Sequence, residues 1–355
     1  MKTKQKFFGA PLRGGAIRGA GTEKKEHEQN LTGSAGAKRV GAPHPRRRQE
    51  QEKNDLSADL KFITLKNPLI PASGTFGYGE EFSPFFDLDI LGAFVMKGIY
   101  KDPRPGNVPP RLHETASGLL NSIGLAGPGA EALKKIIERV AEKTSTPVIV
   151  NVCGADDEEY LEIAQVFDAM PEVALLELNI SCPNVHAGGK CPAQDEQHTF
   201  RLVKLIKQNT TKPLIVKLSP NVSDIVSIAL SAEEAGADAI SLVNTFLGLA
   251  VNLENRKPVF NNIFAGLSGP AIKPLALRLV WEVARQTVVP VIGIGGISTG
   301  RDVLEFILAG ASAVQTGTIN MVEPTASVRI LKEIEVLMTQ LKIKNLNEIK
   351  GELRI

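Results

Sequence analysis

The chain has 355 residues, of which 43% are hydrophobic, and its formal net charge is +2; these values are typical of a globular protein with one large domain or two ordinary ones. It contains no apolar run of about eighteen residues, as a membrane helix needs, and its first residues lack the apolar centre of a secretory signal, so we expect a cytoplasmic protein without a membrane partner. Three cysteines exclude a disulfide framework and are too few to hold an iron–sulfur cluster, so any such cluster must belong to another subunit, and we expect no metal site in this chain.

Residues 1–55 differ in composition from the rest of the chain. They carry 13 Lys and Arg against 6 Asp and Glu, whereas the remainder has a net charge of −5. Their high content of Gly and charge, their few Val, Ile and Leu, and the run Arg46-Arg47-Arg48 indicate a basic, disordered extension. A nucleic-acid-binding arm is the alternative, but aromatic residues are limited to Phe7 and Phe8, which favours a solvated extension with no nucleic-acid partner.

From about Leu60 onward, short apolar runs alternate with longer amphipathic ones, which indicates repeated βα units. Eight strands are expected, at residues 68–73, 93–98, 147–152, 174–181, 213–218, 239–244, 290–295 and 313–317. Helices are expected at residues 131–143, 158–168, 199–208, 222–235, 274–285, 301–309 and 325–341. Eight such units predict a (β/α)8 TIM barrel, which we place at residues 56–355 as the catalytic domain.

A doubly wound open sheet is the competing architecture. Gly293-Ile294-Gly295-Gly296 resembles part of a dinucleotide fingerprint. It lies too late in the chain, however, and lacks the third glycine at the required spacing. The barrel is therefore favoured.

Polar or glycine residues end the expected strands. They are Ser73, Lys97, Asn151, Asn179, Lys217, Asn244, the pair Gly295-Gly296 and the pair Gly317-Thr318. Parallel barrel strands bring their carboxyl ends to one mouth, where active sites are built. The glycine pairs follow the seventh and eighth strands, where barrel enzymes commonly bind phosphate, so a phosphorylated ligand is expected.

A thiol follows the fourth strand. Residues 173–180 are apolar apart from Glu177 and Asn179, and Pro183 then ends the strand, so that Cys182 is expected on the loop that leaves it. Free cysteines are usually packed as small hydrophobic residues. Asn179 and Asn184 on either side favour a catalytic site instead, because buried amides without partners are costly.

Over residues 57–340 the chain resembles the dihydroorotate dehydrogenases of class 1, and among them type 1B. Five segments carry the resemblance: Ala72-Ser-Gly-Thr-Phe-Gly-Tyr-Gly79, Asn121-Ser-Ile-Gly-Leu125, Asn179-Ile-Ser-Cys-Pro-Asn184, Gly266-Leu-Ser-Gly-Pro-Ala-Ile-Lys-Pro274 and Gly295-Gly-Ile297 with Ala309-Gly-Ala-Ser-Ala-Val-Gln-Thr-Gly317. The first segment favours type 1B over the fumarate-using type 1A, and Cys182 in place of a serine argues against the membrane-associated class 2. Val243 and residues 190–193 depart from the family pattern, and the second departure bears on the mobility of the active-site loop.

The resemblance implies FMN as the cofactor and dihydroorotate or orotate as the ligand. FMN would be held by Ser73, Lys97, Gly98, Asn151, Asn179, Lys217, Val243, Gly269, Gly295, Gly296, Gly317 and Thr318. The substrate would be held by Lys97, Asn121, Ser122, Ile123, Gly124, Leu125, Asn179, Asn184, Asn244 and Thr245. Cys182 would be the catalytic base that removes the C5 proton, and Lys217 would face the N1/C2 edge of the flavin.

The implied reaction is the oxidation of (S)-dihydroorotate to orotate in de novo pyrimidine (UMP) biosynthesis. Electrons would leave through a partner subunit with FAD and a [2Fe-2S] cluster to NAD, in a heterotetramer of two catalytic and two electron-transfer subunits. The resemblance begins near Leu56, so a chain that starts there is expected to be complete in fold and function, and Leu56 is a candidate non-ATG start.

Three alternatives remain open. A different FMN barrel, such as a dihydropyrimidine dehydrogenase-like domain or a tRNA dihydrouridine synthase, is the nearest, although the acidic charge of residues 56–355 disfavours an RNA substrate. A type 1A enzyme with fumarate as acceptor is the second. A non-catalytic barrel that binds a phosphorylated ligand is the third, and it leaves Lys217 and the asparagines unexplained.

Overall fold

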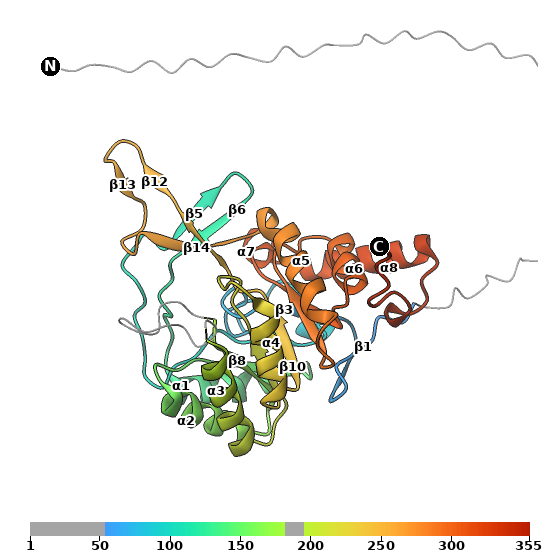
Figure 1. Ribbon diagram of the computed structural model, residues 1–355, viewed down its shortest axis with the longest axis horizontal. Coiled ribbons are helices and arrows are strands. Elements are labelled where there is room, and N and C mark those ends of the chain that lie inside the picture. The colour runs from blue at the N-terminus through green and yellow to red at the C-terminus, as the bar shows by residue number, and fades with distance from the viewer. Residues whose placement is uncertain (1–53, 182–194) are drawn as a thin grey trace, which may run out of the picture. The chain divides into compact units, whose positions relative to one another are not determined.

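The computed structural model describes residues 54–181 and 195–355. Its centre is a parallel eight-stranded sheet (Figure 1). In the order in which they pair, the strands are β3 (Leu69–Pro71), β16 (Ala313–Thr316), β15 (Val291–Ile294), β10 (Ala239–Leu242), β9 (Leu214–Lys217), β8 (Val173–Asn179), β7 (Val148–Val152) and β4 (Phe94–Val95). The Gly92 amide donates to the Leu69 carbonyl at 3.1 Å, which joins the two end strands of this order. The predicted (β/α)8 barrel and its eight strand positions are confirmed.

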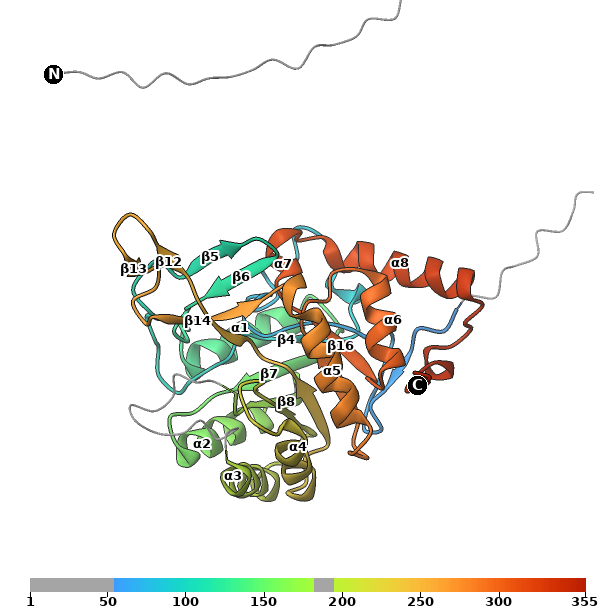
Figure 2. The same ribbon diagram turned by 45° about the horizontal axis from the view of Figure 1, so that its top comes forward.

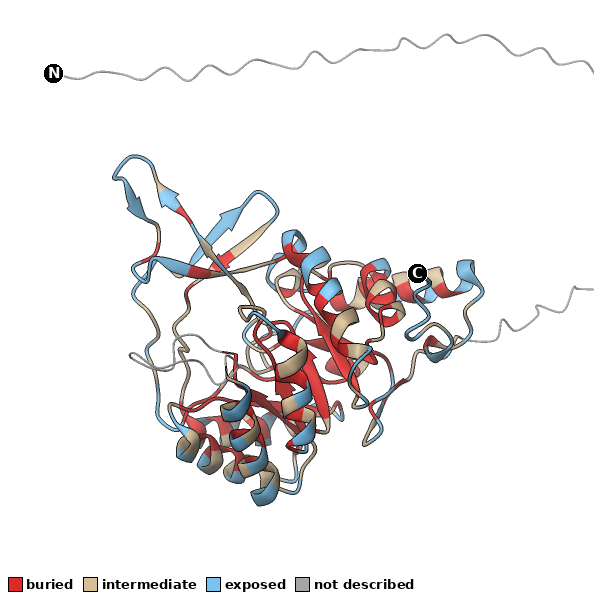
Figure 3. Cartoon of the chain, in the orientation of Figure 1, coloured by how far each residue is buried: buried red, intermediate tan, exposed pale blue. Residues whose placement is uncertain are grey.

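Helices cover the outside of the barrel, and the apolar face of each amphipathic helix is buried against the strands (Figure 3). They are α1 (Ala130–Ala141), α2 (Asp157–Asp168), α3 (Glu196–Asn209), α4 (Ile225–Glu234), α5 (Lys273–Ala284), α6 (Gly300–Leu308), the short α7 (Ile319–Val322) and α8 (Ala326–Leu341). The part of the chain that the structure describes also contains the 3-10 turns η1 (Leu88–Ile90), η3 (Pro270–Ile272) and η4 (Leu346–Glu348). Asp156, Asp195 and Asp224 each accept a hydrogen bond from a first-turn amide, which fixes where α2, α3 and α4 begin. In the described residues, no helix combines the length and apolar composition that a membrane crossing requires.

An antiparallel hairpin closes the amino-terminal end of the barrel. It consists of β1 (Ala58–Asp59) and β2 (Thr64–Leu65). Leu60 and Leu65 are fully buried in a cluster with side chains from the early part of every barrel strand. The hairpin, which the sequence pattern did not predict, therefore fills the amino-terminal end of the barrel with apolar side chains.

A second sheet stands at the opposite end, beyond the carboxyl ends of the barrel strands (Figure 2). Its antiparallel strands pair in the order β11 (Phe246–Leu249), β14 (Phe264–Ser268), β6 (Gly118–Asn121) and β5 (Leu112–Thr115). The hairpin of β12 (Val251–Asn252) and β13 (Lys257–Pro258) extends from it. Two insertions, one after β4 and one after β10, thus form one sheet above the mouth.

The amino-terminal side of the described chain is tied to its carboxyl-terminal side. The Asp55 amide donates to the Lys344 carbonyl at 2.8 Å, and Asn345 Nδ2 donates to the Asp55 carboxylate at 2.7 Å. Asn54 Nδ2 donates to Thr339 Oγ1 on α8 at 2.9 Å. The predicted division at residues 55 and 56 stays a prediction, but Asn54 and Asp55 contact the barrel domain.

We expect a shortened chain that begins at Asn54 to melt within about 1 °C of the full chain, because it keeps these contacts. A chain that begins at Leu56 should melt a few degrees lower, because each lost hydrogen bond contributes about 1 kcal/mol, and about 1 kcal/mol shifts the melting temperature of a large domain by roughly 2–4 °C. Calorimetry of the three chains is the measurement. A chain from Asn54 that melts well below the full chain would show that residues 1–53 contribute to stability.

Candidate active site

A cavity of about 440 Å³ opens at the carboxyl ends of the barrel strands, beneath the second sheet. This volume lies within the range of small-molecule sites, roughly 300–1,000 Å³. The residues predicted from the sequence that line it are Ser73, Lys97, Gly98, Asn121, Ser122, Ile123, Gly124, Leu125, Asn179, Lys217, Val243, Asn244, Thr245, Gly269, Gly295, Gly296, Gly317 and Thr318. The structure therefore brings nearly all of the predicted site residues together.

One predicted residue, Asn151, does not line this wall and is fully buried behind it. Two others, Cys182 and Asn184, lie outside the described residues. Ser181, the last described residue before Cys182, is buried, and its hydroxyl accepts a hydrogen bond from Asn244 Nδ2 at 2.7 Å.

Lys217 is a buried cation at the end of β9. Its side chain is 5% exposed, and its Nζ lies 3.6 Å from Glu177 Oε2 on the neighbouring strand β8. The Glu177 side chain is fully buried. Two buried charges that would each be costly alone thus compensate each other, with the ammonium at the cavity wall and the carboxylate behind it.

Three neutral donors complete the surroundings of Glu177. Asn151 Nδ2 donates to its carboxylate at 2.8 Å, Ser241 Oγ at 3.1 Å and Gln315 Nε2 at 2.6 Å. They come from β7, β10 and β16. With Lys217 on β9 and Glu177 itself on β8, five strands of the barrel meet at one carboxylate.

A chain of amide contacts runs from Glu177 toward the cavity. Asn179 Nδ2 donates to Asn151 Oδ1 at 3.1 Å, and the Asn179 oxygen accepts from the Ser181 hydroxyl at 2.7 Å. The Tyr160 hydroxyl on α2 donates to the Asn179 carbonyl at 2.7 Å and fixes the end of β8. The asparagines are thus held by the protein before any ligand binds.

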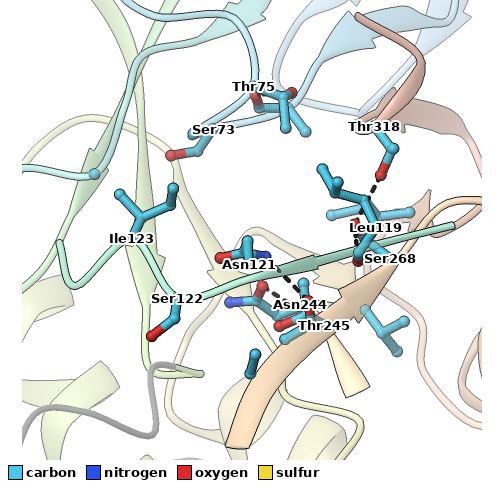
Figure 4. Close-up of a pocket in the computed structure, with 18 of the residues that line it drawn as sticks. Ser73, Thr75, Leu119, Asn121, Ser122, Ile123, Asn244, Thr245, Ser268 and Thr318 are labelled. Atoms are coloured by element: carbon cyan, nitrogen blue, oxygen red, sulfur yellow. Dashed lines mark hydrogen bonds between the residues drawn. The ribbon is translucent and has the colours of Figure 1, made fainter. Parts of the chain in front are cut away.

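The second sheet supplies the opposite side of the cavity. Figure 4 shows Asn121 from β6 close to Asn244 and Thr245, which follow β10. Asn121 Nδ2 donates to the Gly266 carbonyl at 3.2 Å. An added Cβ at Gly266 would lie 2.3 Å from Thr245 Oγ1, so only glycine allows β14 to approach this closely.

The glycine pairs form a third region of the wall. Gly295 and Gly296 have φ values of 131° and 72°, which glycine adopts without strain. An added Cβ at Gly317 would meet no protein atom within 4 Å, although Gly317 lines the cavity. Thr318 Oγ1 donates to Ser268 Oγ at 2.8 Å (Figure 4). The open space beside Gly317 lets a ligand approach the backbone, as phosphate groups do in glycine-rich turns.

Lys97 is the second cation of the wall. Burial, and then the charge of Arg111, lower the pKa of its ammonium group. Nearby, burial raises the pKa of Tyr78 to about 12. A half-buried lysine beside another cation favours an anionic ligand group, because the negative charge of that group would offset both the burial of the Lys97 ammonium and its repulsion by Arg111.

The model of the dihydroorotate dehydrogenase family matches residues 55–338. The chain belongs to the dihydroorotate dehydrogenase family.

Among its curated relatives in this family is a protein of Geobacter sulfurreducens named dihydroorotate dehydrogenase B (NAD(+)), catalytic subunit. It is 49% identical over 304 residues, which cover 86% of this chain and 100% of the relative. A protein of Pelobacter propionicus with the same name is 50% identical over 303 residues, or 85% of this chain and 99% of the relative. The dihydroorotate dehydrogenase of Eimeria tenella, solved with ferulenol, has a TM-score of 0.72 at 23% identity and covers 86% of this chain and 90% of its own, which shows the shared fold.

Sequence reasoning missed two groups of residues. Gln315 and Ser241 contact Glu177 behind the cavity wall and do not line the cavity, and Ser181 contacts Asn179. Ser268 and Asn262 line the cavity. Polar residues inside otherwise apolar strands were the available signal for the first two. In the described ranges 54–181 and 195–355, no group of three or more His, Cys, Asp and Glu side chains is placed to hold a metal ion.

Proposed function

We propose that this chain is the catalytic subunit of an NAD-linked dihydroorotate dehydrogenase, which oxidises (S)-dihydroorotate to orotate in pyrimidine biosynthesis. The observation that carries the proposal is the match over nearly the whole length of relatives that bear this name, at about 49% identity. The cavity supports it, because the residues that the family resemblance assigns to flavin and substrate lie together. The cytoplasmic location stays a prediction.

The donors in the cavity fit FMN. The turns at Gly295-Gly296 and Gly317-Thr318 would hold its phosphate, and Lys217 would lie beside its ring. Ser73, Gly98, Val243 and Gly269 line the same space, while Asn151 would act from behind the wall. Bound FMN supplies a hydride acceptor, which the side chains of this protein do not offer.

The substrate residues would recognise the ring amides and the carboxylate of dihydroorotate. Asn121, Asn179 and Asn244 offer amide groups in fixed orientations. Lys97 supplies a cation for the carboxylate, and Ser122, Ile123, Gly124, Leu125 and Thr245 form the wall around the ring. A ring with different polar groups would leave these amides unpaired, which gives selectivity.

Cys182 would remove the C5 proton as general base, and Asn184 would contact the substrate; both lie outside the described residues. A thiol has an ordinary pKa of about 8.5, so the base needs a mildly alkaline solution or a local cation to become thiolate.

Flavin reduction by the substrate tests this function directly. The purified chain is expected to be yellow, and anaerobic addition of dihydroorotate should bleach the flavin absorbance and yield orotate. A colourless chain that FMN does not restore, or a flavin that dihydroorotate leaves oxidised, would refute the proposal. A flavin reduced by dihydrouridine in tRNA or by dihydropyrimidines, and not by dihydroorotate, would favour the alternative flavin barrels.

The electron-transfer partner is the second part of the proposal. The relatives are named catalytic subunits, which implies another subunit for them. We propose a partner with FAD and a [2Fe-2S] cluster, in a heterotetramer of two catalytic and two electron-transfer subunits.

We expect the chain alone to reduce NAD at least about a hundredfold more slowly than the reconstituted complex. Without the proposed partner, NAD would not be held beside a flavin, and the bound FMN would exchange electrons with free NAD only poorly. Steady-state NADH formation with and without the partner is the measurement, and an artificial dye acceptor that reacts with the chain alone is the control. Fast NAD reduction by the single chain would contradict the partner, and rapid turnover with fumarate would move the enzyme to type 1A.

A further inference from the structure

Glu177 has no role in the function proposed so far, yet it is the most completely enclosed charge of the site. Its carboxylate is fully buried on β8, behind the cavity wall, and accepts hydrogen bonds from Asn151, Ser241 and Gln315. Lys217 Nζ, which can only donate, lies 3.6 Å from the same carboxylate, so the four groups around Glu177 all meet it as donors and Glu177 acts there as an acceptor.

Because Glu177 accepts hydrogen bonds, it determines the orientation of the Asn151 side-chain amide. Its Nδ2 must face Glu177, at 2.8 Å, because its oxygen would be repelled by the carboxylate. Its Oδ1 must then point the other way, where it accepts from Asn179 Nδ2 at 3.1 Å. The thiol of Cys153 lies 3.6 Å from the same oxygen and donates to it as well.

The orientation of the Asn179 side-chain amide is fixed by its hydrogen bonds in the same way. Its Oδ1 accepts from the Ser181 hydroxyl at 2.7 Å and from the Ser181 amide at 3.3 Å, which uses both lone pairs. Its Nδ2 uses one hydrogen on Asn151 and keeps one. Since Asn179 lines the cavity, the hydrogen that remains makes it a donor toward a ligand and never an acceptor.

We propose that Glu177 is a positioning residue that fixes the hydrogen-bond direction of Asn151 and Asn179, so that Asn179 selects a ligand with an oxygen at that point of the cavity. This inference rests on the proposed function, in which the ring oxo groups and the carboxylate of dihydroorotate and orotate supply such an oxygen. A ligand that places an N–H there meets a second donor and is rejected.

Two substitutions abolish the imposed hydrogen-bond direction of Asn151 and Asn179 in different ways. Glu177→Gln keeps the shape but offers Asn151 either an oxygen or an N–H, so that the orientation is no longer imposed. Asn151→Ala keeps the carboxylate but breaks the link to Asn179. Ser241→Ala is the matched control, because Ser241 also donates to Glu177 but does not link it to Asn179 by a hydrogen bond and does not line the cavity.

The experiment measures the dissociation constant of orotate for each flavin-loaded variant from the change in the flavin spectrum. It is repeated with orotate analogues in which one oxo group at a time is replaced by an amino group. Glu177→Gln and Asn151→Ala should weaken orotate binding about tenfold. For one of the analogues, the ratio of its dissociation constant to that of orotate should fall by a similar factor. Ser241→Ala should change both quantities by less than about twofold.

A purely structural role would weaken orotate and the analogues equally, so an unchanged preference in both test variants overturns the inference. Wild-type affinity in both variants also overturns it, as does an equal loss in Ser241→Ala. Thermal unfolding of each loaded variant identifies one that has lost its fold, and the other test variant then decides. If the wild-type chain takes up FMN but shows no response to orotate, the proposed function fails as well; if only the variants behave unexpectedly, the inference alone fails.

Discussion

Replacing Cys182 with serine should slow the reduction of the bound flavin by dihydroorotate by about 10²–10⁴ at neutral pH, the range that general acid–base catalysis contributes. A hydroxyl is a far weaker base than a thiolate, whereas the change in size is small, so FMN should remain bound. Rapid mixing of the oxidised variant with dihydroorotate under anaerobic conditions measures the rate, and the flavin content of the purified protein measures retention.

The matched control is Cys191→Ser, which changes the next cysteine in the chain and should leave the rate within about twofold. In the wild type the rate should rise with pH as the thiol ionises, and the serine variant should lose this rise over the same interval. A wild-type rate in Cys182→Ser would remove this residue from the mechanism.

Replacing Lys217 with alanine should affect both the flavin and the fold. The ammonium is 3.6 Å from the fully buried Glu177 carboxylate, so its removal leaves an unpaired buried charge, a change that typically costs about 3–5 kcal/mol. It also removes the cation at the cavity wall that would stabilise the negative charge of the reduced ring. We expect a lower melting temperature, a reduced FMN content and slower reduction by dihydroorotate.

A double variant separates these two effects. Lys217→Ala combined with Glu177→Gln removes both charges, so that no unpaired charge remains, and most of the lost stability should return. The slow reduction should persist, because the cation is still missing. Calorimetry and the ratio of FMN to protein are the measurements. Full flavin content and a wild-type rate in Lys217→Ala would contradict a role beside the flavin, and recovery of the rate in the double variant would assign the defect to stability alone.

The barrel was predictable because its evidence is local. A buried parallel strand such as β7, with the sequence Val-Ile-Val-Asn-Val, is a continuous apolar run, and α6 repeats its apolar residues at helical spacing. The site was largely predictable for a related reason. Once the strands are known to be parallel, residues at their carboxyl ends, such as Lys217 and Asn244, must converge.

The remainder depends on contacts between distant residues. All four residues of β5 are exposed, so this strand carries no alternating apolar signal. Its neighbour β6 pairs with β14 in a register, Asn121 opposite Gly266, that no spacing rule supplies. Glu177 was visible as a polar residue in an apolar strand, but its partners come from four other strands and are defined only when the barrel closes.

The pairing of Asp55 with Asn345 has a practical consequence for handling the protein. Helices of this barrel run antiparallel to its strands, so the end of α8 lies at the amino-terminal face, away from the cavity. The final residues stay on that face, since the Leu353 amide donates to the Leu308 carbonyl at the end of α6. An affinity tag or surface linker attached after Ile355 therefore leaves the mouth of the cavity unobstructed, and the immobilised protein would present its ligand entrance to the solution.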